Sequence, residues 1–117
     1  AENVRVVEGD VADVLPGIKC DVVIANPPYI PDSQKLPRDV AGFEPHIALF
    51  GGPTGMEIPQ QFIAAAARLL KSGGVLVIEH TEEQGGVIAS ALSVDFLEVA
   101  LHDDLVGRPR WTSAVRR

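Results

Sequence analysis

Thiols and long apolar runs are scarce in this 117-residue sequence. Cys20 is its single cysteine, so no disulfide can form within the chain, and a reducing compartment is the natural setting. No stretch approaches the roughly 18–20 apolar residues that cross a membrane, and the amino-terminal residues do not resemble a signal peptide. These absences exclude a disulfide scaffold and predict a soluble, cytoplasmic protein without a membrane partner.

Basic residues are also in short supply. Ten lysines and arginines stand against 16 acidic residues, which gives a formal net charge of −6. Such a surface is a poor electrostatic match to a phosphate backbone, so no direct nucleic-acid partner is expected. With 46% hydrophobic residues, the chain has the composition of one globular domain. The sequence leaves the oligomeric state open.

The most informative segment is Asn26-Pro27-Pro28-Tyr29, which follows the apolar run Val22–Ala25. A short β-branched run bounded by prolines predicts a buried strand of a parallel sheet. Asn26 then stands at the carboxyl end of that strand, where open α/β sheets bind their ligands. The prolines restrict the backbone and hold the Asn26 amide in place. The alternative is a plain turn, which Asn-Pro dipeptides often form.

These residue types suit methyl transfer to a planar NH2 group. The Asn26 side-chain oxygen and the Pro27 carbonyl can each accept one N–H of an acceptor amide, which orients its nitrogen toward an incoming methyl group. Tyr29 offers an aromatic face to a planar amide and to a nearby sulfonium cation. The motif therefore predicts an amide- or amine-nitrogen methyltransferase site.

The rest of the chain alternates between strand and helix patterns. The order predicts an α/β fold with a parallel centre and an antiparallel edge. A turn-rich connection follows the first strand, and residues 29–55 form a long loop of the kind that is usually functional. Gly73-Gly74 is expected to end the first helix. Strands are predicted at residues 4–7, 21–25, 75–78, 96–101 and 111–115, and helices at residues 58–70 and 82–92.

Several motifs together resemble the HemK/PrmC family, the peptide chain release factor N5-glutamine methyltransferases. The Asn-Pro-Pro-Tyr segment is shared with other methyltransferases, whereas the later blocks are more particular to this family. The matching residues are Asn26-Pro27-Pro28-Tyr29-Ile30-Pro31, Phe43-Glu44-Pro45, Ala48-Leu49-Phe50-Gly51-Gly52-Pro53, Gly55, Gly73-Gly74, Glu79-His80, Asp104-Leu105-Val106-Gly107-Arg108, Arg110 and Arg116.

The resemblance implies the carboxyl-terminal portion of a class I S-adenosylmethionine-dependent methyltransferase fold, which is Rossmann-like. In its sheet order, 3-2-1-4-5-7-6, residues 1–117 would supply strands 3 to 7 as a partial methyltransferase domain. The methyl donor would be S-adenosyl-L-methionine, and the acceptor would be the glutamine of a Gly-Gly-Gln motif in peptide chain release factors. The glycine-rich donor loop and the amino-terminal helical domain of the family are absent from this sequence, so these residues alone are expected to be inactive.

Carried over by position, the resemblance implies that Asn26, Pro27 and Tyr29 act in catalysis and, with Pro28, bind the acceptor. Glu44 would line the acceptor pocket, although it could instead cap a helix or pair with Arg38. Asp10 and Val11 would lie near the donor's adenine, with Asn26 also contacting the donor; the alternative for Asp10 is a turn residue.

Six other candidate residues have simpler interpretations. Glu79 and His80 are expected to be structural or to shape the substrate site. Arg108 and Arg110 are either a solvated hairpin tip or a docking patch for a protein partner. His46 and His102 lack metal-ligand spacing, so no metal is expected. Two rival functions remain, an adenine-N6 nucleic-acid methyltransferase fragment and a non-catalytic partner-binding module.

Overall fold

The computed structural model describes residues 3–28 and 55–117, in which four strands form one sheet. The strands are β1 (Cys20–Ala25), β2 (Leu70–Glu79), β3 (Phe96–Asp103) and β4 (Pro109–Arg116), and their order across the sheet is β1-β2-β4-β3. The β1–β2 pair is parallel, whereas β4 runs antiparallel to both β2 and β3. This arrangement confirms the predicted succession 4-5-7-6 and the antiparallel edge.

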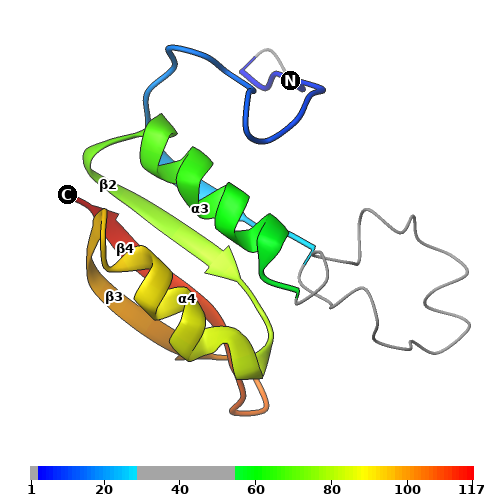
Figure 1. Ribbon diagram of the computed structural model, residues 1–117, viewed down its shortest axis with the longest axis vertical. Coiled ribbons are helices and arrows are strands. Elements are labelled where there is room, and N and C mark those ends of the chain that lie inside the picture. Colours follow the sequence, from blue (N-terminus) through cyan, green and yellow to red (C-terminus); the bar gives the residue numbers. More distant parts are fainter. Residues whose placement is uncertain (1–2, 29–54) are drawn as a thin grey trace, which may run out of the picture.

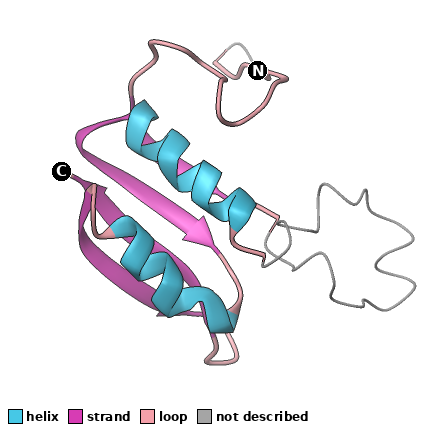
Figure 2. Ribbon diagram, in the orientation of Figure 1, coloured by secondary structure: helices cyan, strands magenta, loops and turns pink. Residues whose placement is uncertain are grey.

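Helices cover only one face of this sheet within the described residues (Figure 1). α3 (Glu57–Leu69) packs on β1 and β2, and α4 (Gly85–Leu92), preceded by the 3-10 turn η1 (Glu82–Gln84), packs on β3 and β4. Figure 2 shows the same two helices side by side on the near surface of the strands. The two helices therefore form a single layer on the sheet.

The core lies between the sheet and these helices. Apolar residues at helical spacing, such as Ile63 and Ala66 in α3, meet every second residue of the strands because side chains alternate across a strand. Arg68 in the last turn of α3 and Glu57 in the first suit the helix dipole. The remaining core includes Ala25, Ala67, Leu70, Leu76, Ile78, Ile88, Leu92, Phe96 and Ala114.

The opposite face of the sheet has no helix over it in the described part of the chain. Its side chains form rows across the strands, because the register pairs Ile24 with Val77 and Val77 with Ser113. Ile24 is 79% exposed, and Val22 on the same strand is 54% exposed. We call this surface, made by Val22, Ile24, Val75, Val77, Leu97, Ala100, His102, Trp111, Ser113 and Val115, the open face.

The strand predicted at residues 4–7 is not formed. Val4, Val6 and Val7 have no strand pairing, and Val6 is 96% exposed. A strand needs a neighbour for its backbone groups, and in the family order the neighbours of this one belong to strands that residues 1–117 do not supply. The strand predicted from the local β pattern alone is therefore wrong. The family order leaves these residues without neighbours and predicts one of three outcomes: pairing with residues 21–25, completion by another chain, or fraying. The unpaired segment agrees with the third.

The prediction that Gly73-Gly74 ends the first helix was also wrong. α3 ends at Leu69, and β2 begins at the next residue. Gly73 has φ +83° and lies where the β1–β2 register shifts, and a Cβ on Gly74 would lie 2.9 Å from the Lys71 carbonyl oxygen. The two glycines thus form an irregularity at the start of β2, where a left-handed residue and a close backbone approach are needed.

The other elements agree with their predictions to within a few residues, including the turn-rich segment before β1 and the hairpin between β3 and β4. The predicted long loop falls largely at residues 29–54, outside the described residues. No described helix has the length and apolar character needed to cross a membrane.

Candidate active site

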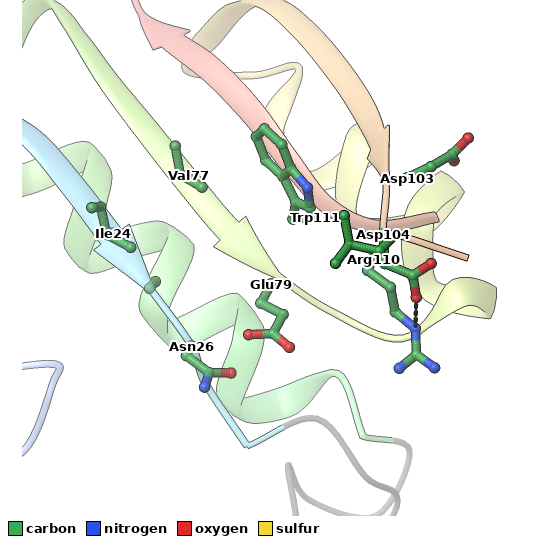
Figure 3. A pocket seen from close by; sticks show the side chains of 10 residues that line it. Ile24, Asn26, Val77, Glu79, Asp103, Asp104, Arg110 and Trp111 are labelled. Carbon is green, nitrogen blue, oxygen red and sulfur yellow. Dashed lines mark ion pairs between the residues drawn. The ribbon is translucent and has the colours of Figure 1, made fainter. Parts of the chain in front are cut away.

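A pocket of about 680 Å³ opens at the carboxyl ends of β1 and β2, on the open face (Figure 3). Strand residues form its floor, and the β3–β4 hairpin forms one side. Most of its wall is apolar, with a few polar groups among the lining residues. These residues are Ile24, Ala25, Asn26, Val77, Glu79, Asp103, Asp104, Leu105, Arg110 and Trp111.

Asn26 lies at the carboxyl end of a strand, as the sequence predicted, and it lines this pocket. β1 ends at Ala25, whose register partner is Ile78, so Asn26 lies beside Glu79 at the end of β2. The Asn26 side chain is exposed, whereas Pro27 directly after it is fully buried. A buried proline behind an exposed amide keeps the backbone fixed while the side chain faces solvent. Pro28 is half-buried next to them.

Glu79 and His80 take different roles although they are adjacent. Glu79 lines the pocket. His80 is fully buried on the helix side, where its Nε2 lies 2.7 Å from the Thr112 hydroxyl and its Nδ1 lies 2.8 Å from the Thr81 carbonyl oxygen. Both ring nitrogens of His80 are therefore hydrogen-bonded, and the contact from Nε2 links the end of β2 to β4, as expected of a structural histidine.

Asp104 organises the hairpin beside the pocket. Its Oδ1 accepts hydrogen bonds from the backbone N–H groups of Val106, at 2.9 Å, and Arg108, at 3.0 Å. The hydrogen bond from Arg108 is the main reason that the pKa of the Asp104 carboxyl is lowered, and the Val106 N–H and the Arg110 charge add to it. Gly107 takes the left-handed conformation that closes the turn.

The two arginines of this hairpin have different environments. Arg108 is exposed at the tip, which matches the solvated reading. Arg110 is half-buried and lines the pocket. Its Nε forms an ion pair with the Asp104 Oδ2 at 3.4 Å, but it has no hydrogen-bond partner among the described residues. Arg110 is therefore a pocket residue and not only part of a hairpin tip.

Trp111 is one of the pocket residues that the sequence patterns did not single out. It pairs with Glu79 on one side and with His102 on the other, and its ring stacks on the His102 ring with centroids 3.8 Å apart. The alternation of the last strand was a usable signal, because it puts Trp111 on the same face as Ser113 and Val115. The alternation within this strand does not show whether Trp111 and Asn26 lie on the same face of the sheet.

Asp10 and Val11 are not brought to this pocket. Asp10 forms a tight turn by accepting the Ala12 backbone N–H at 2.8 Å, and the Val11 carbonyl accepts from Arg68 at 3.4 Å. Arg68 ends α3 next to the start of β1, and six residues of strand, about 20 Å, separate that end from Asn26. In this structure Asp10 serves as a turn residue, and its contact with the donor's adenine stays a prediction.

Tyr29 and Glu44, predicted to complete the acceptor site, lie outside the described residues, as does His46. His102 is engaged by Trp111 and by the Ser113 hydroxyl, 2.8 Å from its Nε2. Residues 3–28 and 55–117 contain no grouping of three or more His, Cys, Asp or Glu side chains able to hold a metal ion.

The succession β1-β2-β4-β3, with a reversed β4 and an Asn-Pro-Pro segment at the end of β1, is that of the carboxyl-terminal part of a class I methyltransferase domain. No protein-family model matches the chain. Curated relatives do match it, and all of those named below are release factor glutamine methyltransferases.

The protein of this name from Mycolicibacterium smegmatis is 40% identical over 97% of the chain, and that from Moorella thermoacetica is 39% identical over all of it. A Mycobacterium tuberculosis relative is 38% identical over 97%. The chain spans only 39–43% of these relatives' own lengths. The matches confirm the resemblance to the release factor glutamine methyltransferases and place it in the carboxyl-terminal part of those proteins.

Proposed function

We propose that the complete protein carrying these residues transfers a methyl group from S-adenosylmethionine to the side-chain amide nitrogen of the Gly-Gly-Gln glutamine in peptide chain release factors. The observation that carries the proposal is the exposed Asn26 amide, backed by the buried Pro27, at the end of a parallel strand and on the rim of a largely apolar pocket. The printed names of the relatives supply the acceptor class.

The role of the motif follows from the electronic structure of an amide. Its nitrogen lone pair is delocalised into the carbonyl, so the nitrogen attacks poorly unless its geometry is controlled. The Asn26 side-chain oxygen and the Pro27 carbonyl would accept the two N–H hydrogens, and no hydrogen bond within the described residues claims the Pro27 carbonyl. Alignment of this kind can supply a large part of a rate enhancement. Tyr29 is proposed to pack against the same amide, with Pro28 and Glu44 shaping its surroundings.

The described residues fit the methyl-bearing end of the donor better than its nucleoside. S-adenosylmethionine supplies an electrophilic methyl group on a positively charged sulfur when it is bound. The carboxylate of Glu79, beside Asn26 in the pocket, suits a positive charge there. The sequence has no Gly-x-Gly loop to cradle the rest of the molecule. Contact of Asp10 and Val11 with the adenine is therefore proposed only for the complete protein.

A cytoplasmic location is part of the proposal, since release factors act on cytoplasmic ribosomes and the lone Cys20 suits a reducing compartment. The net charge of −6 favours a protein acceptor over nucleic acid. The rival reading, a partner-binding module without catalysis, predicts release-factor binding with no methyl transfer.

The test compares the complete protein with its Asn26→Ala variant, using mass spectrometry of a release factor incubated with S-adenosylmethionine. We expect turnover to fall on the order of a hundredfold or more, because a hydrogen bond aligned in the transition state is lost. The thermal midpoint should stay the same, since the Asn26 side chain is exposed. Methylation at near wild-type rate by this variant would remove the basis of the proposal.

A further inference from the structure

Trp111 lies in the same row of side chains on the open face as Asn26, which is proposed to bind the acceptor amide. Glu79 pairs with Trp111 across β2 and β4, and Asn26 lies beside Glu79 at the end of β1. Two strand spacings, roughly 10 Å, therefore separate Asn26 from Trp111. Both residues line the pocket, one at each side of it.

The indole is held with one face occupied. His102 stacks on it with an interplanar angle of 15°, and the Ser113 hydroxyl, 2.8 Å from the His102 Nε2, fixes the imidazole. β4 lies between β3 and β2, and His102 belongs to β3. The second face of the indole is therefore turned toward β2, over the part of the pocket that leads to Asn26.

The length of a glutamine side chain fits this spacing. From its Cα to its amide nitrogen an extended glutamine reaches roughly 5 Å, about half the distance between the two residues. An acceptor whose amide nitrogen lies at Asn26 would thus have its main chain over Glu79, with the neighbouring peptide group at the indole. A peptide plane can lie flat on an aromatic face only where no side chain intervenes, and glycine has none.

We propose that the second face of the Trp111 indole receives the main chain beside the acceptor glutamine and selects glycine at the adjoining positions, with His102 acting as its positioning residue. This inference rests on the proposed function and adds to it a determinant of acceptor sequence. It assigns the Trp111–His102 pair a role in recognition rather than in holding the sheet together.

The experiment uses the complete protein, S-adenosylmethionine and two synthetic peptides, in which the glutamine follows either two glycines or two alanines. The wild-type protein should prefer the glycine peptide. In Trp111→Ala, kcat/KM for the glycine peptide should fall about tenfold, mainly through a higher KM, since the loss of a stacking contact affects binding more than the methyl transfer itself. The preference between the two peptides should shrink to within about twofold.

Three further variants separate recognition from packing. Leu97→Ala removes a large apolar side chain from the same open face but outside the pocket, and it should leave both peptides unaffected. His102→Ala should raise KM for the glycine peptide only, and His102→Phe, which keeps a flat ring against the indole, should restore it. Should Trp111→Ala fail to fold, Trp111→Phe is expected to retain the preference and Trp111→Leu to lose it.

Two results would overturn the inference, and they differ from each other. A wild-type protein that methylates neither the peptides nor a release factor ends the proposed function, and this inference with it. A wild-type protein that methylates the glycine peptide, while Trp111→Ala keeps the same KM and the same preference, leaves the function standing and makes Trp111 a packing residue of the open face.

Discussion

Ile78 and Ile24 lie on neighbouring strands of one sheet, yet the first is completely buried under the helices and the second is 79% exposed on the open face. The same contrast runs along the strands. Leu76 and Ala114 face α3 and α4 and are buried, whereas Val77 and Ser113, one residue away, remain partly accessible. Similar residue types therefore have opposite environments, depending only on which side of the pleat they occupy.

The two faces of the sheet have different roles: one contributes most to the stability of the fold, and the other carries the candidate active site. The covered face holds nearly all of the buried apolar surface, which is the main favourable contribution to folding. The open face carries the pocket, with Asn26, Glu79 and Trp111. Parallel sheets are usually covered on both faces. The open face therefore combines a binding site with an apolar surface that further polypeptide could cover.

The largest expected difference is between matched truncations on the two faces. Ile78→Ala should lower the free energy of unfolding by about 2–5 kcal/mol because it leaves a cavity in the core. Ile24→Ala should lower it by less than about 0.5 kcal/mol, as surface substitutions usually do. Urea denaturation of residues 1–117 measures both. Equal losses would mean that the open face is buried in solution, by another segment or by a second copy of the chain.

A smaller difference is expected between neighbouring hydroxyl groups. Thr112→Val removes the partner of the buried His80 Nε2, and the unsatisfied nitrogen should cost about 1–3 kcal/mol of unfolding free energy. Ser113→Ala removes the partner of His102 on the open face, where water can replace it, and should cost less than about 1 kcal/mol. A larger loss from Ser113→Ala would show that the His102–Trp111 stack is a structural element.

The smallest effect concerns the hairpin at the edge of the open face and depends on pH. The folded pKa of Asp104 lies below its ordinary value of 3.8, chiefly because its carboxylate accepts the Arg108 N–H. A lowered folded pKa means that the charged form stabilises the fold above pH 3.8 and that this stabilisation disappears as pH falls below 3.8. Because the side chain is close to solvent, the contribution is small.

Asp104→Asn keeps the shape of the side chain and removes its charge. At pH 7 the variant should have a slightly lower urea midpoint than the wild-type chain, and the two midpoints should converge as pH is lowered below 3.8. A gap that stays constant from pH 7 into this acid range would show that the hydrogen bonds, and not the charge, stabilise the hairpin.

Much of the fold was accessible from local patterns. Apolar β-branched runs predicted β1 and β2, and alternation predicted β3 with β4 as its antiparallel return. Helical spacing predicted α3 and α4, and the motif resemblance predicted the order of the strands. Asn26 at the end of a strand followed from the same patterns, because an apolar run followed by prolines has few other conformations. In these cases the determining interactions lie within a few residues of each other along the chain.

Two local predictions failed for a common physical reason. A β pattern at residues 4–7 does not make a strand when no neighbouring strand supplies hydrogen bonds. The local pattern predicts a helix end at Gly73-Gly74, although the contact that constrains Gly74 comes partly from the Asp21 carbonyl oxygen, far away in sequence. Both features depend on partners that a local pattern does not contain.

The sequence by itself thus determined most of the helices and strands, the family resemblance and the strand end that carries Asn26, since these depend on short-range geometry and on motifs. Only the tertiary structure decided which face of the sheet the helices cover, that Trp111 and Arg110 share a pocket with Asn26, and that Asp10 and Val11 lie at the other end of β1. The physical reason is the register of the strands. Glu79 pairs with Trp111 through hydrogen bonds between β2 and β4, and the neighbouring His80–Thr112 contact joins residues 32 positions apart in the sequence.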